Sequence, residues 1–270
     1  MEDSMKVKQS LNAIALVVGS LLTVSSAALA NEKISVAATP VPAAEILEFM
    51  KPQLAEQGVD LNVLVFTDYI QPNQQVAEKQ IDMNCFQHRP HLKSYNEQEK
   101  QNLVQQGFMY VLPMAAYSDK IKSIDELKDK ASVAIPSDTT NGARALLLLQ
   151  KAGLIKLKNP DDIFATSRDI VENPKNLKFI ELEAASVPRA LADVDLAVIN
   201  TNYALDIKLN PKEDAVILED VNSPYALVCA SREDNKDSEL VKKVNKAWQS
   251  EATVKFIEEK YKGSVIPVKE

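Results

Sequence analysis

The chain has 270 residues, of which 46% are hydrophobic and 26% charged, and a formal net charge of −7, a composition typical of globular proteins. The acidic balance disfavours nucleic acid as a partner and offers no basic patch to anionic lipid. The length is sufficient for one large domain or two smaller ones.

The first thirty residues are typical of a secretory signal peptide. Residues 11–30 are uncharged and mostly apolar, follow Lys6 and Lys8, and end in the small-residue pattern of Ala28 and Ala30. This pattern predicts cleavage before Asn31, with a membrane anchor as the alternative. We expect the mature chain to be soluble, in the periplasm or secreted, and not lipid-anchored, because no cysteine lies near the cleavage point.

The two cysteines and two histidines have no metal-binding spacing. Cys85 and Cys229 both lie in apolar stretches, so buried free thiols are the expected state and a single disulfide is the alternative. His88 and His91 are only three residues apart and lack further ligands nearby. The sequence therefore predicts no metal and no cofactor.

Short β-type runs alternate with amphipathic helical stretches along the mature chain. The first part of the mature chain is predicted to form a strand over 34–38, a helix over 43–57 closed by Gly58, strands over 61–66 and 81–86, a helix over 91–105 and a strand over 108–113. The middle part is predicted to form a short helix over 123–128, a strand over 131–135 and a helix over 140–152. Strands over 179–182, 196–199, 216–218 and 226–230 follow, and the chain ends in helices over 238–249 and 251–261. Such alternation favours mostly parallel sheets with helices on their faces.

The strand–helix–strand series starts again near residue 123, with no flexible linker before it. This predicts an α/β fold of two lobes, residues 31–112 plus 225–270 and residues 113–224, joined by two crossing strands. The apolar segments Val111 to Ala116 and Tyr225 to Ala230 are the candidates for these crossings. A cleft between two such lobes is a natural site for a small molecule.

Polar side chains at strand ends and at one helix start are candidate ligand contacts. Tyr69, His88 and Asn200 follow predicted strands, and ligands of open α/β sheets bind outside the carboxyl ends of the strands. Asn141 and Arg144 share one face of the first turn of the helix over 140–152. With free backbone N–H groups, the Arg144 guanidinium fork could hold a carboxylate; a solvated arginine is the alternative.

A series of motifs in fixed order resembles one protein family over residues 33–268. The motifs are Phe66-Thr67-Asp68-Tyr69, Gln71-Pro72-Asn73, Phe86-Gln87-His88-Arg89-Pro90, Val133-Ala134-Ile135-Pro136, Arg144 to Gly153, Val171-Glu172-Asn173-Pro174, Glu181-Leu182-Glu183-Ala184, Ala197-Val198-Ile199-Asn200, Ser223-Pro224-Tyr225, Arg232-Glu233-Asp234-Asn235 and Gly263-Ser264-Val265-Ile266-Pro267. On these motifs the chain resembles the methionine-binding (NlpA/MetQ-like) substrate-binding proteins of ABC importers.

The resemblance implies a periplasmic-binding-protein-like (type II) fold that closes over one amino acid. It implies that aromatic and imidazole rings surround a thioether side chain, that an arginine pairs with the ligand carboxylate, and that asparagines supply polar contacts. The ligand-binding residues that it predicts in this chain are Tyr69, Phe86, His88, Asn141, Arg144, Asn200, Tyr225 and Leu227. As partners it implies methionine or a related amino acid or methionyl peptide and an ABC permease–ATPase complex; we expect a monomer.

The chain departs from the family pattern at three places. Leu227 replaces an asparagine that contacts the ligand in the family, and losing one such buried hydrogen bond costs about 1–3 kcal/mol. Thr39-Pro40-Val41-Pro42 replaces a glycine-containing turn, and the lipid-bearing cysteine is absent. Two other functions stay open: a ligand-binding module without transport, and a hydrolase with Cys85 or a serine as nucleophile and His88 as base. The second lacks any accompanying motif, and we predict no catalytic residues.

Overall fold

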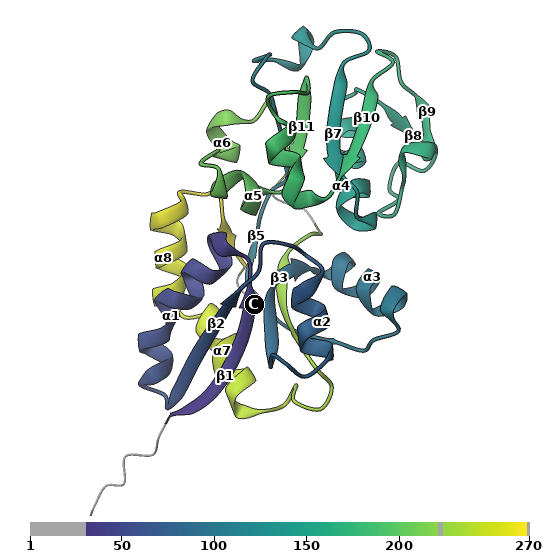
Figure 1. Cartoon of the computed structure of the whole chain (residues 1–270). Coiled ribbons are helices and arrows are strands. Elements are labelled where there is room, and N and C mark those ends of the chain that lie inside the picture. Colours follow the sequence, from purple (N-terminus) through teal and green to yellow (C-terminus); the bar gives the residue numbers. More distant parts are fainter. Residues whose placement is uncertain (1–30, 221–223, 269–270) are drawn as a thin grey trace, which may run out of the picture. The chain divides into compact units, whose positions relative to one another are not determined.

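Two five-stranded sheets, each covered by helices, carry the fold (Figure 1). The computed structural model describes residues 31–220 and 224–268, so the predicted signal peptide lies outside the described residues. No helix within this described part is long and apolar enough to cross a membrane.

The first sheet has the strand order β2-β1-β3-β13-β4. Its strands are β1 (Glu32–Ala38), β2 (Val59–Val65), β3 (Met83–His88), β4 (Val104–Phe108) and β13 (Leu227–Ser231). β1 pairs in parallel with β2 and β3, whereas β13 runs antiparallel to both β3 and β4. A strand from late in the chain therefore lies between two strands from its first half.

Helices cover both faces of the first sheet, and its strands β3 and β13 are buried along their whole length. In Figure 1, α1, α7 and α8 lie on one side of this sheet, and α2 and α3 lie on the other. The bounds are α1 (Glu45–Ala55, preceded by the π-helical turn Pro40–Ala44), α2 (Gln71–Ala77), α3 (Arg89–Glu99), α7 (Glu239–Trp248) and α8 (Glu251–Tyr261). Leu47, Met50 and Trp248 fill the first interface, and Val76 and Leu92 pack in the second.

The second sheet has the strand order β10-β7-β11-β6-β12. Its strands are β6 (Ala115–Tyr117), β7 (Ser132–Pro136), β10 (Lys178–Leu182), β11 (Leu196–Ile199) and β12 (Ile217–Leu218). β10, β7 and β11 are parallel, whereas β6 is antiparallel to β11 and β12. In each sheet four of the five strands point the same way, and only β13 in the first and β6 in the second run opposite, so the prediction of mostly parallel sheets is correct.

The helices and minor strands of the second half complete the fold. The helices are α4 (Thr139–Lys151), α5 (Thr201–Asp206) and α6 (Pro211–Asp214). Three 3-10 turns cover Ile124–Glu126, Ser167–Asp169 and Ala184–Ala190. Two pairs of short strands are β5 (Tyr110–Val111) with β14 (Ile266–Pro267), and β8 (Lys156–Leu157) with β9 (Ile170–Glu172). The apolar face of α4 packs on β7 through Leu146 and Leu149.

Side-chain caps begin three of the main helices at defined residues. The side chains of Asp138, Ser238 and Ser250 each accept the backbone N–H three residues later, at the start of α4, α7 and α8. Such caps satisfy a backbone donor that the helix leaves unpaired and contribute about 1 kcal/mol each. The sequence prediction places all three helices to within one residue at either end.

One predicted helix is wrong in its second half. The stretch 91–105 was expected to be helical throughout, but α3 ends at Glu99 and Lys100 adopts a left-handed φ of 52°. Residues 104–108 form strand β4, because their backbone pairs with β13. The pairing lies more than a hundred residues away in sequence, and the local helical pattern gave no sign of it.

The expectation of free thiols at Cys85 and Cys229 is also wrong. The two residues face each other across β3 and β13 with their Cα atoms 4.0 Å apart, and their sulfurs form a disulfide. Both side chains are 0% exposed. The antiparallel pairing of the two strands brings them together, which excludes Cys85 as a nucleophile in this state.

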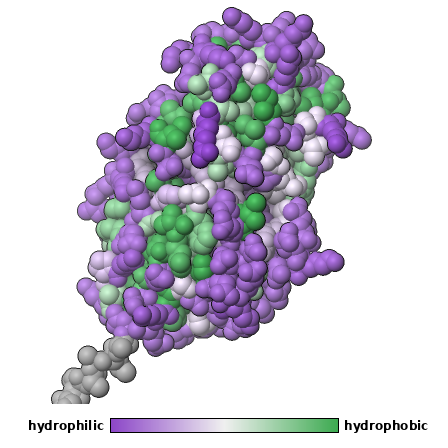
Figure 2. All heavy atoms as spheres, viewed as in Figure 1, coloured by the Kyte–Doolittle hydropathy of each residue, from purple (hydrophilic) through white to green (hydrophobic). Residues whose placement is uncertain are grey.

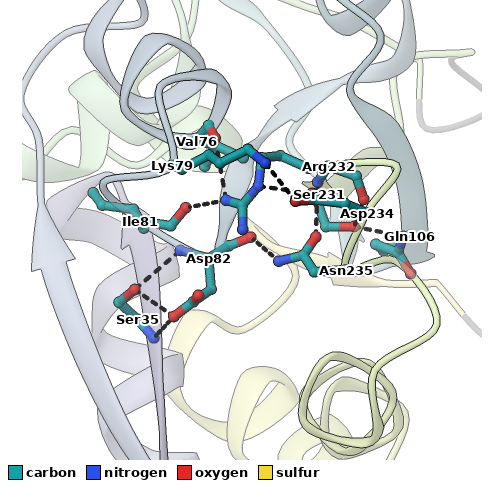
Figure 3. A network of polar contacts seen from close by, with 10 residues as sticks. All are labelled: Ser35, Val76, Lys79, Ile81, Asp82, Gln106, Ser231, Arg232, Asp234 and Asn235. Carbon is teal, nitrogen blue, oxygen red and sulfur yellow. Dashed lines mark hydrogen bonds and ion pairs between the residues drawn. The ribbon is translucent and has the colours of Figure 1, made fainter.

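A polar network fastens the start of β3 to the end of β13 (Figure 3). Arg232 donates from Nη1 to the carbonyl oxygens of Val76, at 3.2 Å, and Ile81, at 2.8 Å. Its Nε donates to Asp234 at 2.9 Å, and Asn235 donates from its amide to the carbonyl of Asp82 at 2.9 Å. The network supplies hydrogen-bond donors to the backbone carbonyls between α2 and β3, and it so fixes where β3 begins.

The chain passes between the sheets twice. Strands of the first sheet come from residues 32–108 and 227–231, and strands of the second from residues 115–218. The predicted crossing over Tyr225 to Ala230 is therefore displaced, because Leu227–Ser231 is a strand of the first sheet. The lobe boundaries 31–112 plus 225–270 and 113–224 stay a prediction.

Hydrophilic side chains cover most of the face drawn in Figure 2, and hydrophobic ones form separate patches between them. The exposed large hydrophobic side chains are those of Phe49, Val65, Ile70, Val171, Ile180, Ile207 and Leu218. Scattered exposure of this kind is normal for a protein in water.

Candidate functional site

A small cavity lies where residues of the two sheets meet. Its lining comes from the segment after β2, the ends of β3 and β11, helix α3, the segment after β5, the starts of α4 and α5, and strand β13. The lining residues are Tyr69, Phe86, Gln87, His88, His91, Leu112, Asn141, Arg144, Asn200, Thr201, Asn202 and Leu227. Seven of the eight residues predicted from the sequence are in this set. The eighth, Tyr225, lies beside it, with its ring centroid 5.0 Å from that of His88.

A β-bulge at the end of β3 directs three consecutive side chains toward the cavity. Val228 pairs with Gln87 and Cys229 pairs with Cys85, which leaves Phe86 unopposed by any residue of β13. A bulge bends the strand and changes where its side chains point. Phe86, Gln87 and His88 therefore all line the cavity, although a regular strand would turn alternate residues away from it.

Three rings form an apolar end of the cavity. The ring centroids of Tyr69 and Phe86 are 5.9 Å apart, those of Tyr69 and His91 are 6.0 Å apart, and those of Phe86 and His91 are 5.8 Å apart. His91 was not among the predicted site residues, although its position one helical turn after His88 could have indicated it. Ring faces and edges at this spacing suit a polarizable, unbranched side chain.

Hydrogen bonds define the proton positions on both histidines. His88 Nδ1 accepts the backbone N–H of His91 at 3.1 Å, so its proton is on Nε2, which donates to Asn141 Oδ1 at 3.1 Å. His91 Nδ1 lies 3.2 Å from Gln87 Oε1, an acceptor, so that nitrogen carries its proton. Burial lowers the pKa of His88 well below its ordinary value of 6.5, and Arg144 lowers it further. Burial also lowers the pKa of His91, against the opposing charge of Asp138.

Asn141 joins the two halves of the cavity. Its Oδ1 accepts from His88 and also from Asn200 Nδ2, at 2.8 Å. Its Nδ2 donates to both carboxylate oxygens of Asp138, at 3.0 and 3.1 Å. Asn200 Oδ1 is buried and has no hydrogen-bond partner among the described residues. An unpaired buried acceptor costs free energy unless a donor reaches it, so Asn200 marks a place for an N–H or O–H group.

The start of α4 is not the open anion site that the sequence suggested. Asp138 caps the helix: its Oδ1 accepts the backbone N–H of Asn141 at 3.0 Å, and its carbonyl accepts that of Gly142 at 2.8 Å. The carboxylate of Asp138 thus already occupies the end of the helix where an anion would be stabilised. Any anion held here depends on the side chain of Arg144.

Arg144 is buried and paired, so the alternative of a solvated arginine is wrong. It is 3% exposed, and its Nε donates to Glu219 Oε1 at 2.9 Å while its Nη2 donates to Glu219 Oε2. Nη2 also donates to the carbonyl of Leu112 at 2.7 Å. The guanidinium carbon lies 4.4 Å from the ring centroid of Tyr225, a cation–π contact. Nη1 has no hydrogen-bond partner among the described residues.

Leu227, the departure from the family pattern, forms an apolar part of the cavity wall. It is buried in β13 opposite His88, and its carbonyl accepts the backbone N–H of Met109 at 2.9 Å. Its side chain brings no polar group to the cavity. The polar contacts of this wall therefore come from Asn200 and Arg144.

A buried amide cluster supports the site from behind. Asn73, Asn84 and Gln87 are almost fully buried and satisfy one another: Gln87 Nε2 donates to Asn73 Oδ1 at 2.6 Å and to Asn84 Oδ1 at 2.9 Å. Asn73 returns a bond to Gln87 Oε1 at 2.8 Å. A fully paired cluster of this kind fixes side-chain positions in a core. The motif Gln71-Pro72-Asn73 contained this signal, but the sequence reasoning did not assign it a role.

Two tyrosine hydroxyls connect the segment after β2 with α5. Tyr69 donates to Asn202 Oδ1 at 2.5 Å, and Tyr203 donates to the carbonyl of Thr67 at 3.0 Å. Burial raises the pKa of Tyr69 well above its ordinary value of 10, so the hydroxyl keeps its proton. These bonds hold one edge of the cavity together across the two lobes.

Within residues 31–220 and 224–268, no three His, Cys, Asp or Glu side chains come together in a way that could hold a metal ion.

Comparison with known proteins agrees with this geometry. The family model described as NlpA lipoprotein matches residues 34–269. The D-methionine-binding lipoprotein MetQ of Salmonella typhi is 48% identical over 211 residues, 77% of this chain and 78% of that protein. MetQ of Escherichia coli is 47% identical over the same shares of both chains.

Solved structures are similar over nearly the whole described chain. The methionine-binding protein MetQ has a TM-score of 0.85 at 42% identity, covering 88% of this chain and 98% of that one. A nutrient-binding protein from Burkholderia cenocepacia, solved with methionine bound, has a TM-score of 0.84 at 44% identity, covering 87% and 99%. The two-lobed periplasmic-binding-protein fold is therefore confirmed. The chain belongs to the NlpA lipoprotein family of substrate-binding proteins.

Proposed function

We propose that this protein is the substrate-binding component of an ABC importer and that it binds methionine, or a closely related amino acid or methionyl peptide, in the cavity. The observation that carries the proposal is the division of the cavity into an apolar end made of three rings and a polar end. The polar end holds a buried arginine and an unpaired amide oxygen. A ligand with a carboxylate, an amino group and an unbranched apolar side chain matches both ends.

The proposed pose assigns each part of the ligand to a group. The thioether lies among the rings of Tyr69, Phe86 and His91, where burying such a side chain contributes about 1.5–3 kcal/mol. The carboxylate accepts from Arg144 Nη1, as a charge-assisted hydrogen bond. The amino group donates to Asn200 Oδ1, the acceptor left unpaired within the described structure. His88, Asn141 and Tyr225 hold these groups in place, and Leu227 closes the wall.

Ligand-dependent stability tests the proposal directly. We expect L-methionine or D-methionine to raise the Tm of the mature protein, since a ligand that binds only the folded state adds about 2.7 kcal/mol at one hundred times its Kd. Titration calorimetry should give one site per chain. The same screen includes all other amino acids, methionyl dipeptides and methionine sulfoxide. Absence of both a Tm shift and heat across this set would contradict the proposal.

Transport is tested separately from binding. In a strain that needs external methionine, we expect deletion of the gene to slow growth at limiting methionine and expression of the chain to restore it. Restoration should fail with Arg144→Ala. Growth that does not depend on the gene, together with intact methionine binding, would leave a binding module without transport as the better description.

We further propose that the mature protein is a soluble monomer without a lipid anchor, in the periplasm or secreted. Support comes from the cysteines: both are bonded to each other inside the first sheet, so neither offers a thiol for lipid. The related proteins are named lipoproteins, which makes the point testable. Intact mass spectrometry of the exported chain should give the unlipidated mass, and a mass increased by acyl chains would contradict it.

The lobe division is part of the same proposal. We take residues 31–112 plus 225–270 as one lobe and residues 113–224 as the other, since each range contains the strands of one sheet. Ligand binding should then reduce hydrogen exchange on both sides of the cavity, at β3 and at the start of α4. Protection on one side alone would count against binding between the lobes.

A further inference from the structure

Glu219 is the partner of the one arginine in the cavity, and it comes from the second passage between the sheets. Its carboxylate accepts from Arg144 Nε at 2.9 Å and from Arg144 Nη2. Its Oε2 also accepts the backbone N–H of Met114 at 3.0 Å, and its own backbone N–H donates to the carbonyl of Met114 at 2.9 Å. The side chain is 14% exposed. Glu219 therefore ties α4 to both passages between the lobes.

Among the described residues, the hydrogen bonds of Arg144 leave one of its nitrogens, Nη1, without a partner. A guanidinium has five N–H donors: one on Nε and two on each Nη. Glu219 takes the Nε proton and one on Nη2, and the carbonyl of Leu112 takes the other on Nη2. The two protons on Nη1 remain. A ligand carboxylate is thus met end-on by Nη1 and not by the two-nitrogen fork, which Glu219 already occupies.

Glu219 also sets the charge that a ligand meets. Arg144 is the only Lys, Arg, Asp or Glu among the described residues that line the cavity, and burial keeps His88 and His91 uncharged near neutral pH. Glu219 neutralises Arg144, and the Asp138 carboxylate bonded to Asn141 adds a negative charge nearby, so the empty site has no excess positive charge. A zwitterion leaves that balance unchanged. An anion would add an uncompensated negative charge beside the Glu219 carboxylate, and such a buried charge is strongly disfavoured.

We propose that Glu219 is a positioning and specificity-determining residue: it orients Arg144 so that Nη1 alone meets the ligand carboxylate, and it makes the site select zwitterionic amino acids over anions of the same shape. The inference rests on the proposed function, because it takes methionine as the reference ligand. It assigns to Glu219 an effect on ligand charge that a purely structural role would not have.

The test compares two ligands of nearly equal shape and different charge. L-Methionine is a zwitterion, and 2-hydroxy-4-(methylthio)butanoate has a hydroxyl in place of the ammonium group and is an anion. Calorimetry or competition gives the Kd of each for the wild type, Glu219→Gln and Glu219→Asp. Glu172→Gln is the matched control, because Glu172 forms an exposed ion pair with Lys156 in the same half of the chain, at 2.6 Å. Circular dichroism establishes that each variant is folded.

We expect the wild type to prefer methionine by about 100-fold or more, which corresponds to about 2.7 kcal/mol. Glu219→Gln should lower this preference at least tenfold, because the anion then meets an uncompensated guanidinium. Glu219→Asp keeps the charge, so it should weaken both ligands and hold the preference within about threefold of the wild type. Glu172→Gln should leave it unchanged.

Three outcomes overturn the inference while the proposed function stands. They are equal loss of both ligands in Glu219→Gln, a preference below threefold in the wild type, and equal loss of preference in the Asp and Gln variants. If Glu219→Gln does not fold, Glu219→Asp and the wild type carry the test: a loss of preference in Glu219→Asp, or a wild-type preference below threefold, overturns the inference. A wild type that binds neither ligand would overturn the proposed function, and the inference with it.

Discussion

Reduction of the Cys85–Cys229 bond should destabilise the first lobe strongly while leaving the cavity chemistry intact. The bond joins residues 144 positions apart in sequence, and it lies between β3 and β13 in the centre of the first sheet. In the unfolded chain it closes a loop of this length, for which the chain-entropy relation gives about 5 kcal/mol at 25 °C. Measured losses for native disulfides are about 2–5 kcal/mol.

That loss is large beside the whole stability of a domain, which is about 5–15 kcal/mol. For a chain of this size it corresponds to a fall in Tm of about 5–15 °C. The assay is urea unfolding followed by circular dichroism, with and without reductant, on the mature wild type and on the Cys85→Ala/Cys229→Ala variant. The wild type should lose about 2–5 kcal/mol on reduction, and the variant should be equally weak under both conditions.

The variant separates the effect of the bond from any other effect of the reductant. Phe86 and Leu227 line the cavity on the same strands as the two cysteines, so some loss of methionine affinity is expected in the variant. The pairing of β3 with β13 keeps both side chains in place, and the loss should therefore be less than about tenfold. The reasoning would be refuted by a wild type whose unfolding midpoint does not change on full reduction, verified by thiol titration.

Four further predictions concern the cavity. Arg144→Ala should weaken methionine binding by about 100-fold or more in calorimetry, because the ligand carboxylate loses its charged donor; affinity within twofold of the wild type would place the carboxylate elsewhere. Leu227→Asn should tighten methionine binding about tenfold, as one added hydrogen bond, and an unchanged Kd would mean that the pocket is built around the leucine. Tyr69→Phe should cost about 0.5–1.5 kcal/mol of unfolding free energy from the lost hydroxyl bond, with Tyr203→Phe as the matched comparison. The pKa values of His88 and His91 are lowered in the folded protein, so the free energy of unfolding should fall as the pH falls below 6.5, by up to about 1.4 kcal/mol per pH unit for each histidine. If a His88→Gln variant lost unfolding free energy equally steeply between pH 6.5 and 5, this prediction would be wrong.

The local sequence pattern was sufficient to predict the bounds of those helices and strands whose ends are set by their own residues. Strand β11 and helix α8 have the predicted bounds, because a buried apolar run and a serine cap define them in the sequence itself. Helices α2 and α5 were missed, since each has fewer than eight residues and too little apolar periodicity to recognise. The first two residues of β4 were predicted as the end of a helix and its last residue as strand, because the bounds of β4 depend on pairing with β13.

A residue of the candidate site could be predicted where its own position in the sequence indicates a role. It could not be predicted where the role depends on a second residue far away in the sequence. Tyr69, His88 and Asn200 follow predicted strands and were candidates from that position alone. Glu219 could not be predicted, because its role depends on Arg144, 75 residues earlier, and on the backbone of Met114. The same holds for the disulfide, which follows from the register of two strands that sequence alone does not set.

The place of β13 in the middle of the first sheet affects the order in which the protein can be completed as the chain is exported. All strands of the second sheet are available once residue 218 has crossed the membrane, whereas the first sheet lacks its fourth strand in spatial order until residue 231 has crossed. Until then β3 has an open edge, and Cys85 has no partner for oxidation. The lobe that begins the chain is therefore the lobe that finishes folding last, and the half of the cavity that contains Phe86 and His88 is completed with it.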